Sequence, residues 1–369
     1  MIEATFWLSF AALGYTYVGY PTVIYLLSTF QRKPVRKGTF LPPIVIVVVA
    51  YNEERVIRTK IENLLSLRYP LGNRRIVIAS DASTDGTDDI VHSYRSKGVT
   101  LVRMKERMGK SAVLNRVLPM LNEEYIVLSD TRQIWSTESL EEMLGNFSDP
   151  TVGAVSGELM LGKGGGDFGK GLGFYWNYEK FIRKREADFD STCGVTGCIY
   201  AMRRSLFETI PDDTLLDDFV IPMNITKKGY RVVFEDSAIA FDRTEEEPKK
   251  EWKRKIRTLS GNYQAFFTMP WLFHLLRNRL FLQVISHKVF RIAAPFFLII
   301  LLFSNFALLK HPIYKTTLAT QVIFYGLALL SFSFDIKILG PIKTFVILNA
   351  AAFMSLPKYL MGKQKAAWK

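Results

Sequence analysis

Four short acidic motifs follow one another in the middle of the chain, and the first three come at or just after the ends of apolar, β-branched runs. The motifs are Tyr51-Asn52-Glu53-Glu54, Ser80-Asp81-Ala82-Ser83-Thr84-Asp85-Gly86-Thr87, Ser129-Asp130-Thr131-Arg132 and Asp217-Asp218. Carboxylates can hydrogen-bond a base and a ribose, hold a cation and accept a proton. In an open α/β sheet, ligands bind at the carboxyl ends of the strands. The motifs therefore predict a site for an activated sugar carried by a nucleotide.

The elements that would position these motifs alternate between strands and helices from residue 38 to residue 262, which is typical of a doubly wound parallel sheet. Apolar residues in the segment 53–67 recur close to the 3.6-residue period of a helix. A glycine-rich segment, Leu161–Leu172, predicts a mobile loop. We expect strands at Ile44–Ala50, Ile76–Ser80, Val99–Met104 and Tyr125–Leu128, and helices at Glu53–Leu67, Thr87–Ser96, Ser111–Leu121 and Phe174–Glu186.

A hydrophobic segment precedes this region. Thr5–Phe30 is almost uncharged and is long enough to span a membrane. Four basic residues, Arg32, Lys33, Arg36 and Lys37, follow it. Because basic flanks favour the cytoplasmic side of a membrane, we expect the region after this segment to lie in the cytoplasm.

Three hydrophobic segments follow the region, at Phe290–Leu309, Thr316–Phe334 and Ile338–Leu356. The third contains Pro341 and Lys343, so it could be tilted, broken or re-entrant. Counting three spans puts the C-terminal tail outside the cell, whereas the lysines of that tail favour the inside. The number of C-terminal spans therefore stays open.

These patterns predict a multi-pass protein of the cell membrane with four parts. Residues 1–37 form a transmembrane helix with a basic flank, and residues 38–262 form a cytoplasmic catalytic domain. Residues 263–289 form interfacial helices, and residues 290–369 form a transmembrane region of about three spans with a basic tail.

Composition narrows the partners of the chain. Of its 369 residues, 49% are hydrophobic, which is high for a wholly soluble protein, and the formal net charge is +13. This charge suits phosphate-rich partners, namely a nucleotide diphosphate and anionic membrane lipids, and we expect no nucleic acid partner. The two cysteines make no disulfide framework, and the four histidines lie far apart in the sequence.

The ordered set of motifs resembles the family-2 glycosyltransferases, which include the membrane enzymes related to the cellulose, chitin and hyaluronan synthases. The set comprises Asn-Glu-Glu, Ser-Asp-x-Ser-x-Asp-Gly-Thr, Arg-x-Gly-Lys, Ser-Asp, Gly-x-x-Gly and Asp-Asp, and it lies within residues 40–262. The resemblance implies an α/β domain of the GT-A type with a mostly parallel sheet. It also implies inverting transfer from a nucleotide sugar, for which we expect a UDP-sugar, to a lipid-linked or glycan acceptor in polysaccharide biosynthesis of the cell envelope.

On the donor side, the resemblance places Tyr51, Asn52 and Glu53 against the nucleotide base and Asp81 at the uracil or ribose. Lys110, at the start of a predicted helix, would meet the diphosphate. Each motif also has a structural alternative. Asn52 fits a helix cap, with Glu53 favouring the helix dipole, while Asp81 fits a structural turn and Lys110 a solvated basic turn.

Asp130 stands where the family usually has Asp-x-Asp, a motif that binds a divalent cation, Mg²⁺ or Mn²⁺. Here Arg132 replaces the second aspartate. A guanidinium cannot ligate a cation, but it can contact a phosphate. Two hypotheses follow: a metal is held by Asp130 and phosphate oxygens alone, or Arg132 partly substitutes for the metal.

For transfer itself, the resemblance makes Asp218 the general base and Asp217 its support. Inverting transfer needs a carboxylate that takes the proton of the acceptor hydroxyl. The alternative is a pair of surface acids. Gly194 and Gly197 resemble the family's acceptor-side Gly-x-x-Gly, where small residues let a substrate approach, and Trp176 could stack on a sugar ring or pack in a core.

Arg257 ends a basic segment that precedes the C-terminal apolar segments. Processive relatives carry Gln-x-x-Arg-Trp here, whereas this chain has Arg254-x-x-Arg257-Thr258. We expect Arg257 to keep a diphosphate contact, and the missing Gln and Trp to favour transfer of one or a few sugars. A processive polysaccharide synthase and a catalytically silent, nucleotide-binding membrane scaffold remain the alternative functions.

Overall fold

The computed structural model describes residues 1–162, 167–242, 248–334 and 337–362, and the chain forms two compact units. The first, here called the sheet unit, comprises residues 32–162 and 186–242. The second, the helical unit, comprises the described residues of 1–31, 163–185 and 243–364.

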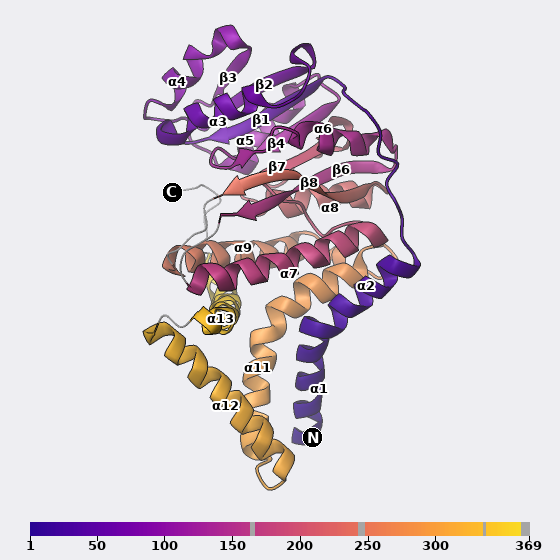
Figure 1. The fold of residues 1–369 in the computed structure, drawn as a ribbon, viewed down its shortest axis with the longest axis vertical. Helices are drawn as coiled ribbons and strands as arrows, with labels where there is room; N and C mark the ends of the chain where they lie inside the picture. The colour runs from indigo at the N-terminus through magenta and orange to yellow at the C-terminus, as the bar shows by residue number, and fades with distance from the viewer. Residues whose placement is uncertain (163–166, 243–247, 335–336, 363–369) are drawn as a thin grey trace. The chain divides into compact units, whose positions relative to one another are not determined.

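The sheet unit is built on one eight-stranded sheet with the order β3-β2-β1-β4-β7-β6-β8-β5 (Figure 1). Four of its seven pairings are parallel, which confirms the predicted mostly parallel α/β class. Strands β1 to β4 form the predicted parallel half, and β7 and β5 run antiparallel to their neighbours. The strands are β1 (Ile44–Ala50), β2 (Arg74–Ser80), β3 (Val99–Arg103), β4 (Tyr125–Ser129), β5 (Ile134–Trp135), β6 (Val152–Leu161), β7 (Ile199–Arg203) and β8 (Arg231–Asp242).

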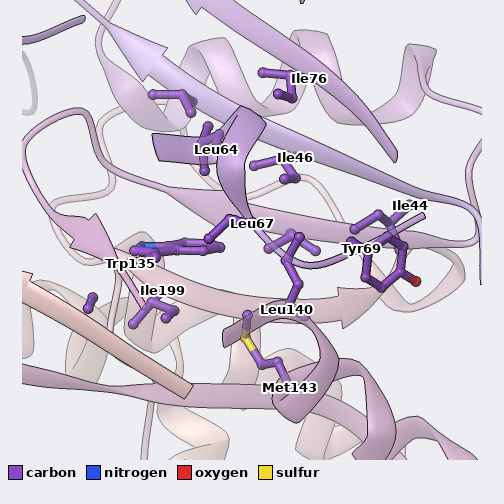
Figure 2. Close-up of a cluster of buried hydrophobic side chains, with 14 of the residues drawn as sticks. Ile44, Ile46, Leu64, Leu67, Tyr69, Ile76, Trp135, Leu140, Met143 and Ile199 are labelled. Atoms are coloured by element: carbon purple, nitrogen blue, oxygen red, sulfur yellow. The ribbon is translucent and has the colours of Figure 1, made fainter. Parts of the chain in front are cut away.

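The helices of the sheet unit that connect these strands are α3 (Glu54–Ser66), α4 (Thr87–Ser93), α5 (Lys110–Val117), α6 (Ser139–Leu144) and α8 (Asp217–Lys227). The first three were predicted, whereas α6 and α8 were not. The apolar stripe of α3 is fully buried at Ile57, Ile61 and Leu64. Figure 2 shows Leu64 in one cluster with Ile46 of β1. Burial on both sides explains why β1 is a continuous run of apolar, mostly β-branched residues.

The helical unit contains three helices that are long and apolar enough to cross a membrane, at Ile2–Phe30, Phe281–Ala307 and Pro312–Ser333. Three of the four apolar segments expected from the sequence fall in these helices. The fourth falls in α13, which is not among the candidate spans. The helices of this unit include α1 (Ile2–Gly14), α2 (Tyr20–Phe30), α7 (Asp167–Phe189, whose last turn enters the sheet unit), α9 (Pro248–Thr268), α11 (Phe290–Ala307), α12 (Pro312–Ser333) and α13 (Gly340–Leu360).

The glycine-rich segment near residue 165 is not the predicted loop throughout. Residues 163–166 lie outside the described residues, and α7 begins at Asp167, so the prediction is wrong from there to Leu172. A side chain at Gly171 would overlap the carbonyl oxygen of Gly340 and the hydroxyl of Thr344. A glycine therefore lets the backbones of α7 and α13 approach closely, which is a packing role rather than a source of mobility.

Candidate functional site

The acidic motifs meet at one edge of the sheet because their strands are parallel and in register. Ala50 of β1 pairs with Ser80 of β2, and Val48 of β1 pairs with Ser129 of β4. The residues that follow these three strands therefore leave the sheet side by side, at its carboxyl edge. This is the edge at which open α/β sheets bind ligands.

The loops after β1 and β2 are bonded to each other. Both contain a non-glycine residue in the left-handed region, Asn52 with φ 54° and Ala82 with φ 56°. Asn52 Oδ1 accepts a hydrogen bond from the N–H of Thr84 at 2.8 Å, and its own N–H donates to Ser83 Oγ at 3.2 Å. The side chain of Asn52 thus joins the two loops. The cap alternative for Asn52 is wrong, because α3 has Glu53 at its N-cap position.

Asp81 organises the loop that leads to α5. Its Oδ1 accepts a hydrogen bond from the N–H of Met108 at 2.8 Å, and its Oδ2 accepts one from the N–H of Gly109 at 2.9 Å. Gly109 has φ 92°, a conformation that suits glycine, and Asp81 is only 3% exposed. Asp81 therefore acts on the site through this loop, and its contact with a base stays a prediction.

Above the same edge, the guanidinium of Arg107 lies 3.7 Å from the ring centroid of Tyr51. Arg107 belongs to the loop that Asp81 holds, so the loop covers one face of the Tyr51 ring. This stacking was missed at the sequence level, because the two residues lie in different loops and their types alone do not predict a contact.

Lys110 joins the two acidic parts of the site. Its Nζ donates to Asp130 Oδ1 at 3.0 Å and is ion-paired with Asp217 Oδ2 at 3.1 Å. Burial acts to lower the pKa of this lysine, but the two carboxylates outweigh burial and hold the pKa well above its usual value. The side chain is 13% exposed, so the solvated-turn alternative is wrong. Lys110 is therefore a largely buried cation between Asp130, which is predicted to face the nucleotide sugar, and the acidic pair.

The acidic pair occupies the first turn of α8, where the helix dipole favours negative charge. Asp217 is 7% exposed, so the surface-pair alternative is wrong for it. The glycine loop packs on Asp218: the N–H of Val195 donates to the carbonyl of Asp218 at 2.8 Å. A Cβ added at Gly197 would lie 3.1 Å from Asp218 Oδ2, and Gly194 has φ 98°. The predicted base and the predicted acceptor-side glycines are therefore neighbours.

Tyr200 of β7 is a further polar group of this cluster that sequence reasoning missed. Its side chain is fully buried, and its hydroxyl has no hydrogen-bond partner within the described part of the chain. Burial, followed by the negative charge of Asp217, raises the pKa of Tyr200 well above its usual value, so the hydroxyl stays protonated. Its setting in an apolar strand, Ile-Tyr-Ala-Met, is typical of a core residue and gave no signal of a site.

Arg132 lies beyond Asp130 and is held by the end of β8. Its Nη2 lies 3.3 Å from Asp242 Oδ2, and Gln133 Nε2 donates to the same oxygen at 2.7 Å. The Arg132 side chain remains 56% exposed. Its guanidinium is therefore oriented by Asp242 while still open to a ligand from solvent. Asp242 was not identified from the sequence, because it follows Asp130 by more than a hundred residues.

The residues at Asp130 fit a cation that a substrate helps to hold, not a preformed metal centre. The described residues include no group of three or more histidine, cysteine or acidic side chains placed to hold a metal. Asp130 supplies one carboxylate, of which Oδ1 contacts Lys110. Mg²⁺ is commonly held by one or two carboxylates together with substrate phosphates, so this donor set suffices only when a diphosphate completes it.

Two predicted site residues belong to the helical unit. Arg257 lies on α9 and Trp176 on α7, and both are partly buried. Lys255, also on α9, lies with its ammonium 5.3 Å from the Trp176 ring. The roles proposed for Arg257 and Trp176 stay predictions.

Comparisons with known proteins indicate which family this chain resembles. Residues 45–210 match the family model "Glycosyl transferase family 2". The chain is 23% identical over 269 residues to the poly-beta-1,6-N-acetyl-D-glucosamine synthase of Staphylococcus aureus, an alignment that covers 70% of this chain and 65% of the synthase. It is 26% identical over 351 residues to the probable glycosyltransferase YdaM of Bacillus subtilis, covering 88% of this chain and 77% of that protein. The chain thus spans just under two thirds of the synthase.

Among solved structures, the chain resembles the mannosyltransferase PcManGT from Pyrobaculum calidifontis, determined in complex with GDP-Man and Mn²⁺. The TM-score is 0.76 at 23% identity, with 99% of this chain and 100% of that chain covered. This likeness shows a shared GT-A-like fold.

Proposed function

We propose that the chain, whose residues 45–210 match the model of glycosyl transferase family 2, an inverting family, moves a sugar from a UDP-sugar to a lipid-linked or glycan acceptor. The observation that carries this proposal is the Lys110 bridge between Asp130 and Asp217. This bridge joins Asp130, predicted on the side of the nucleotide-sugar donor, to the acidic pair that would activate the acceptor.

The proposed reaction uses Asp218 as the base. The acceptor hydroxyl would give its proton to the Asp218 carboxylate while its oxygen bonds to the anomeric carbon of the sugar. The bond from that carbon to the diphosphate breaks on the opposite face, which inverts the configuration. Asp217 supports the base, since its own charge is balanced by Lys110.

The leaving diphosphate gains negative charge as the bond breaks. We propose that Asp130 would hold a Mg²⁺ or Mn²⁺ ion, which would supply positive charge to the diphosphate when bound. Arg132 is oriented by Asp242 and exposed, so it can add a second positive group to the same phosphates. Arg257 is proposed as a further phosphate contact.

The proposed setting is the cytoplasmic face of the cell membrane in a multi-pass protein. The described part of the chain has three helices that are long and apolar enough to cross a membrane, which supports this setting. The first of them, Ile2–Phe30, is followed by the basic residues between Arg32 and Lys37, which favour a cytoplasmic location for the sheet unit. We propose a polyprenyl-phosphate-linked sugar as the acceptor, because an acceptor embedded in the membrane suits an enzyme that carries membrane-spanning helices.

A processive polysaccharide synthase is the second candidate. It is favoured by the similarity to a synthase of poly-beta-1,6-N-acetyl-D-glucosamine. Arg254 and Thr258 stand where the motif of the processive relatives has Gln and Trp, which argues against tight binding of a long chain. We therefore place transfer of one or a few sugars first.

The deciding experiment supplies radiolabelled UDP-GlcNAc, UDP-glucose or GDP-mannose to the purified protein in lipid vesicles containing polyprenyl phosphate and polyprenyl-phosphate-linked sugars, and separates the products by size. We expect a short, lipid-linked product from a UDP-sugar. A high-molecular-weight polymer would establish the synthase instead. A product formed from GDP-mannose alone would replace the proposed donor.

A further inference from the structure

Lys60 is a fully buried lysine in the middle of α3. Its exposed fraction is 0%, and its Nζ donates a hydrogen bond of 2.7 Å to the backbone carbonyl of Gln133. The same ammonium lies 4.7 Å from the ring centroid of Trp135. No carboxylate forms an ion pair with Lys60 within the described part of the chain.

Such a residue is costly to keep in a core. Burial lowers the pKa of Lys60 to about 7, against weaker raising effects of Cys198 and Asp130. Cys198 is itself a neutral thiol, because burial raises its pKa. A methionine would fill the same space without this cost. A purely structural role therefore explains the lysine poorly.

The hydrogen bond of Lys60 is made to the residue that follows Arg132, the arginine that replaces the second aspartate of Asp-x-Asp. Gln133, whose carbonyl Lys60 holds, donates its side-chain amide to Asp242 at 2.7 Å. Asp242 Oδ2 also lies 3.3 Å from Arg132 Nη2. Hydrogen bonds thus link Lys60, through Gln133 and Asp242, to the guanidinium of Arg132.

A second residue of α3 holds the same segment. Asn63, three residues after Lys60 and therefore on the same side of the helix, donates its side-chain amide to the carbonyl of Trp135 at 2.9 Å and accepts from the N–H of Trp135 at 2.8 Å. Residues 133–135 are therefore attached to α3 by three hydrogen bonds. One face of a helix determines where the segment after Asp130 runs.

We propose that Lys60 is a positioning residue: it holds the carbonyl of Gln133 and thereby aims Arg132 at the diphosphate of the nucleotide-sugar donor. The inference rests on the proposed function, because it assumes that Arg132 binds the donor. It goes beyond that function in assigning a role to a residue that touches no substrate.

The test compares Lys60→Met with the wild-type full-length protein in donor-saturation kinetics. Losing the hydrogen bond that positions Arg132 should raise the KM for the UDP-sugar about 10-fold, with kcat changed less than about 3-fold and the thermal midpoint unchanged or higher. A lower thermal midpoint with an unchanged KM would show a structural role and overturn the proposal. Should Lys60→Met not fold, Lys60→Gln gives the same comparison.

A double-mutant cycle separates action through Arg132 from a direct effect. In the Arg132→Ala background, Lys60→Met should leave the KM unchanged, since the residue it positions is gone. Independent, additive effects of the two substitutions would overturn the proposal. Lys97→Met is the matched control, because Lys97 also lies over an aromatic ring, that of Tyr94 at 5.2 Å, but is exposed.

Failure of the proposed function would be visible in the same experiment. Wild-type protein that neither transfers a sugar nor binds UDP or GDP in calorimetry would overturn both proposals. Wild-type protein with saturable transfer, and a Lys60→Met variant of identical KM, would overturn only the role of Lys60.

Discussion

At the scale of single residues, the proposed base is Asp218, the member of the acidic pair that packs on the glycine loop. Its Oδ2 would lie 3.1 Å from a Cβ added at Gly197. Its neighbour Asp217 forms an ion pair with Lys110. The role is proposed for Asp218 because the second member of the family's acidic pair is the base.

Asp218→Asn should therefore reduce the transfer rate about 10²–10⁴-fold, because an amide cannot accept the proton of the acceptor. Nucleotide affinity, measured by calorimetry with UDP, should change little. Asp213→Asn, at an exposed acid shortly before the pair, is the control. Near-wild-type turnover of the Asp218 variant would rule out its assignment as the base.

In the proposed mechanism, a bound cation and Arg132 would together offset the negative charge of the diphosphate. We expect transfer to fall when Mg²⁺ and Mn²⁺ are removed with a chelator, because Asp130 is proposed to share a cation with the donor. Arg132→Asp restores the family's Asp-x-Asp spacing, and should raise the KM for the donor even with metal present, since the guanidinium contact is lost. Full activity in chelator would show that the chain's own cations suffice.

Lys60 also predicts a pH dependence of stability. Its pKa is lowered to about 7 in the folded state, whereas in the unfolded chain it is about 10.4. Between these values the unfolded chain binds more protons, so this group makes the folded state more stable as pH rises. The difference in thermal midpoint between Lys60→Met and wild type should thus be largest at pH 6 and shrink by pH 9. A difference that does not vary with pH would contradict the lowered pKa.

At the scale of elements, the glycine loop before β7 and the first turn of α8 form one structure. A Cβ at Gly197 would lie 3.1 Å from Asp218 Oδ2 and 3.2 Å from its Cβ, closer than ordinary van der Waals contact. The helix turn that carries the base therefore depends on the absence of a side chain in the loop.

Gly197→Ala should displace the Asp218 carboxylate by a few tenths of an ångström and reduce kcat about 10-fold, because catalytic groups tolerate little misplacement. The KM for the donor should stay the same. Gly72→Ala is the matched control, since no atom lies within 4 Å of the Cβ it would add. An unchanged kcat for Gly197→Ala would show that the glycine loop does not determine the position of the Asp218 carboxylate.

The elements also show how far the sequence could predict the site. The ends of β1, β2 and β4 were predictable, because each acidic motif follows a run of apolar residues that only a buried strand explains. The contacts of Lys60 were not, since this residue and Gln133 lie 73 positions apart. Lys110 was identified as a cation of the site, but its burial between two carboxylates depends on α8, which no local pattern joins to α5.

At the scale of the whole chain, hydropathy divides the sequence in the way that the structure does. The apolar ends of the chain form the helical unit, and the alternating middle forms the sheet unit. The exceptions are α7, of which residues through Arg185 belong to the helical unit, and the part of α9 from residue 248 to 262, although the sequence places both inside the predicted catalytic domain. The glycines of α7 looked like a loop, because close packing of two helix backbones leaves the same sequence signal as flexibility.

The left-handed turns at Asn52 and Ala82 have an energetic consequence for how this protein could change. Asparagine tolerates that conformation, but alanine does not, and its strain costs about 1 kcal/mol. Ala82→Gly should therefore raise the free energy of unfolding by up to that amount in thermal denaturation, while a more pliable turn lowers kcat. A lower stability would show that the methyl group is needed for packing. If stability rises and kcat falls as expected, a single codon change at Ala82 would let natural variation increase thermal stability at the expense of the catalytic rate.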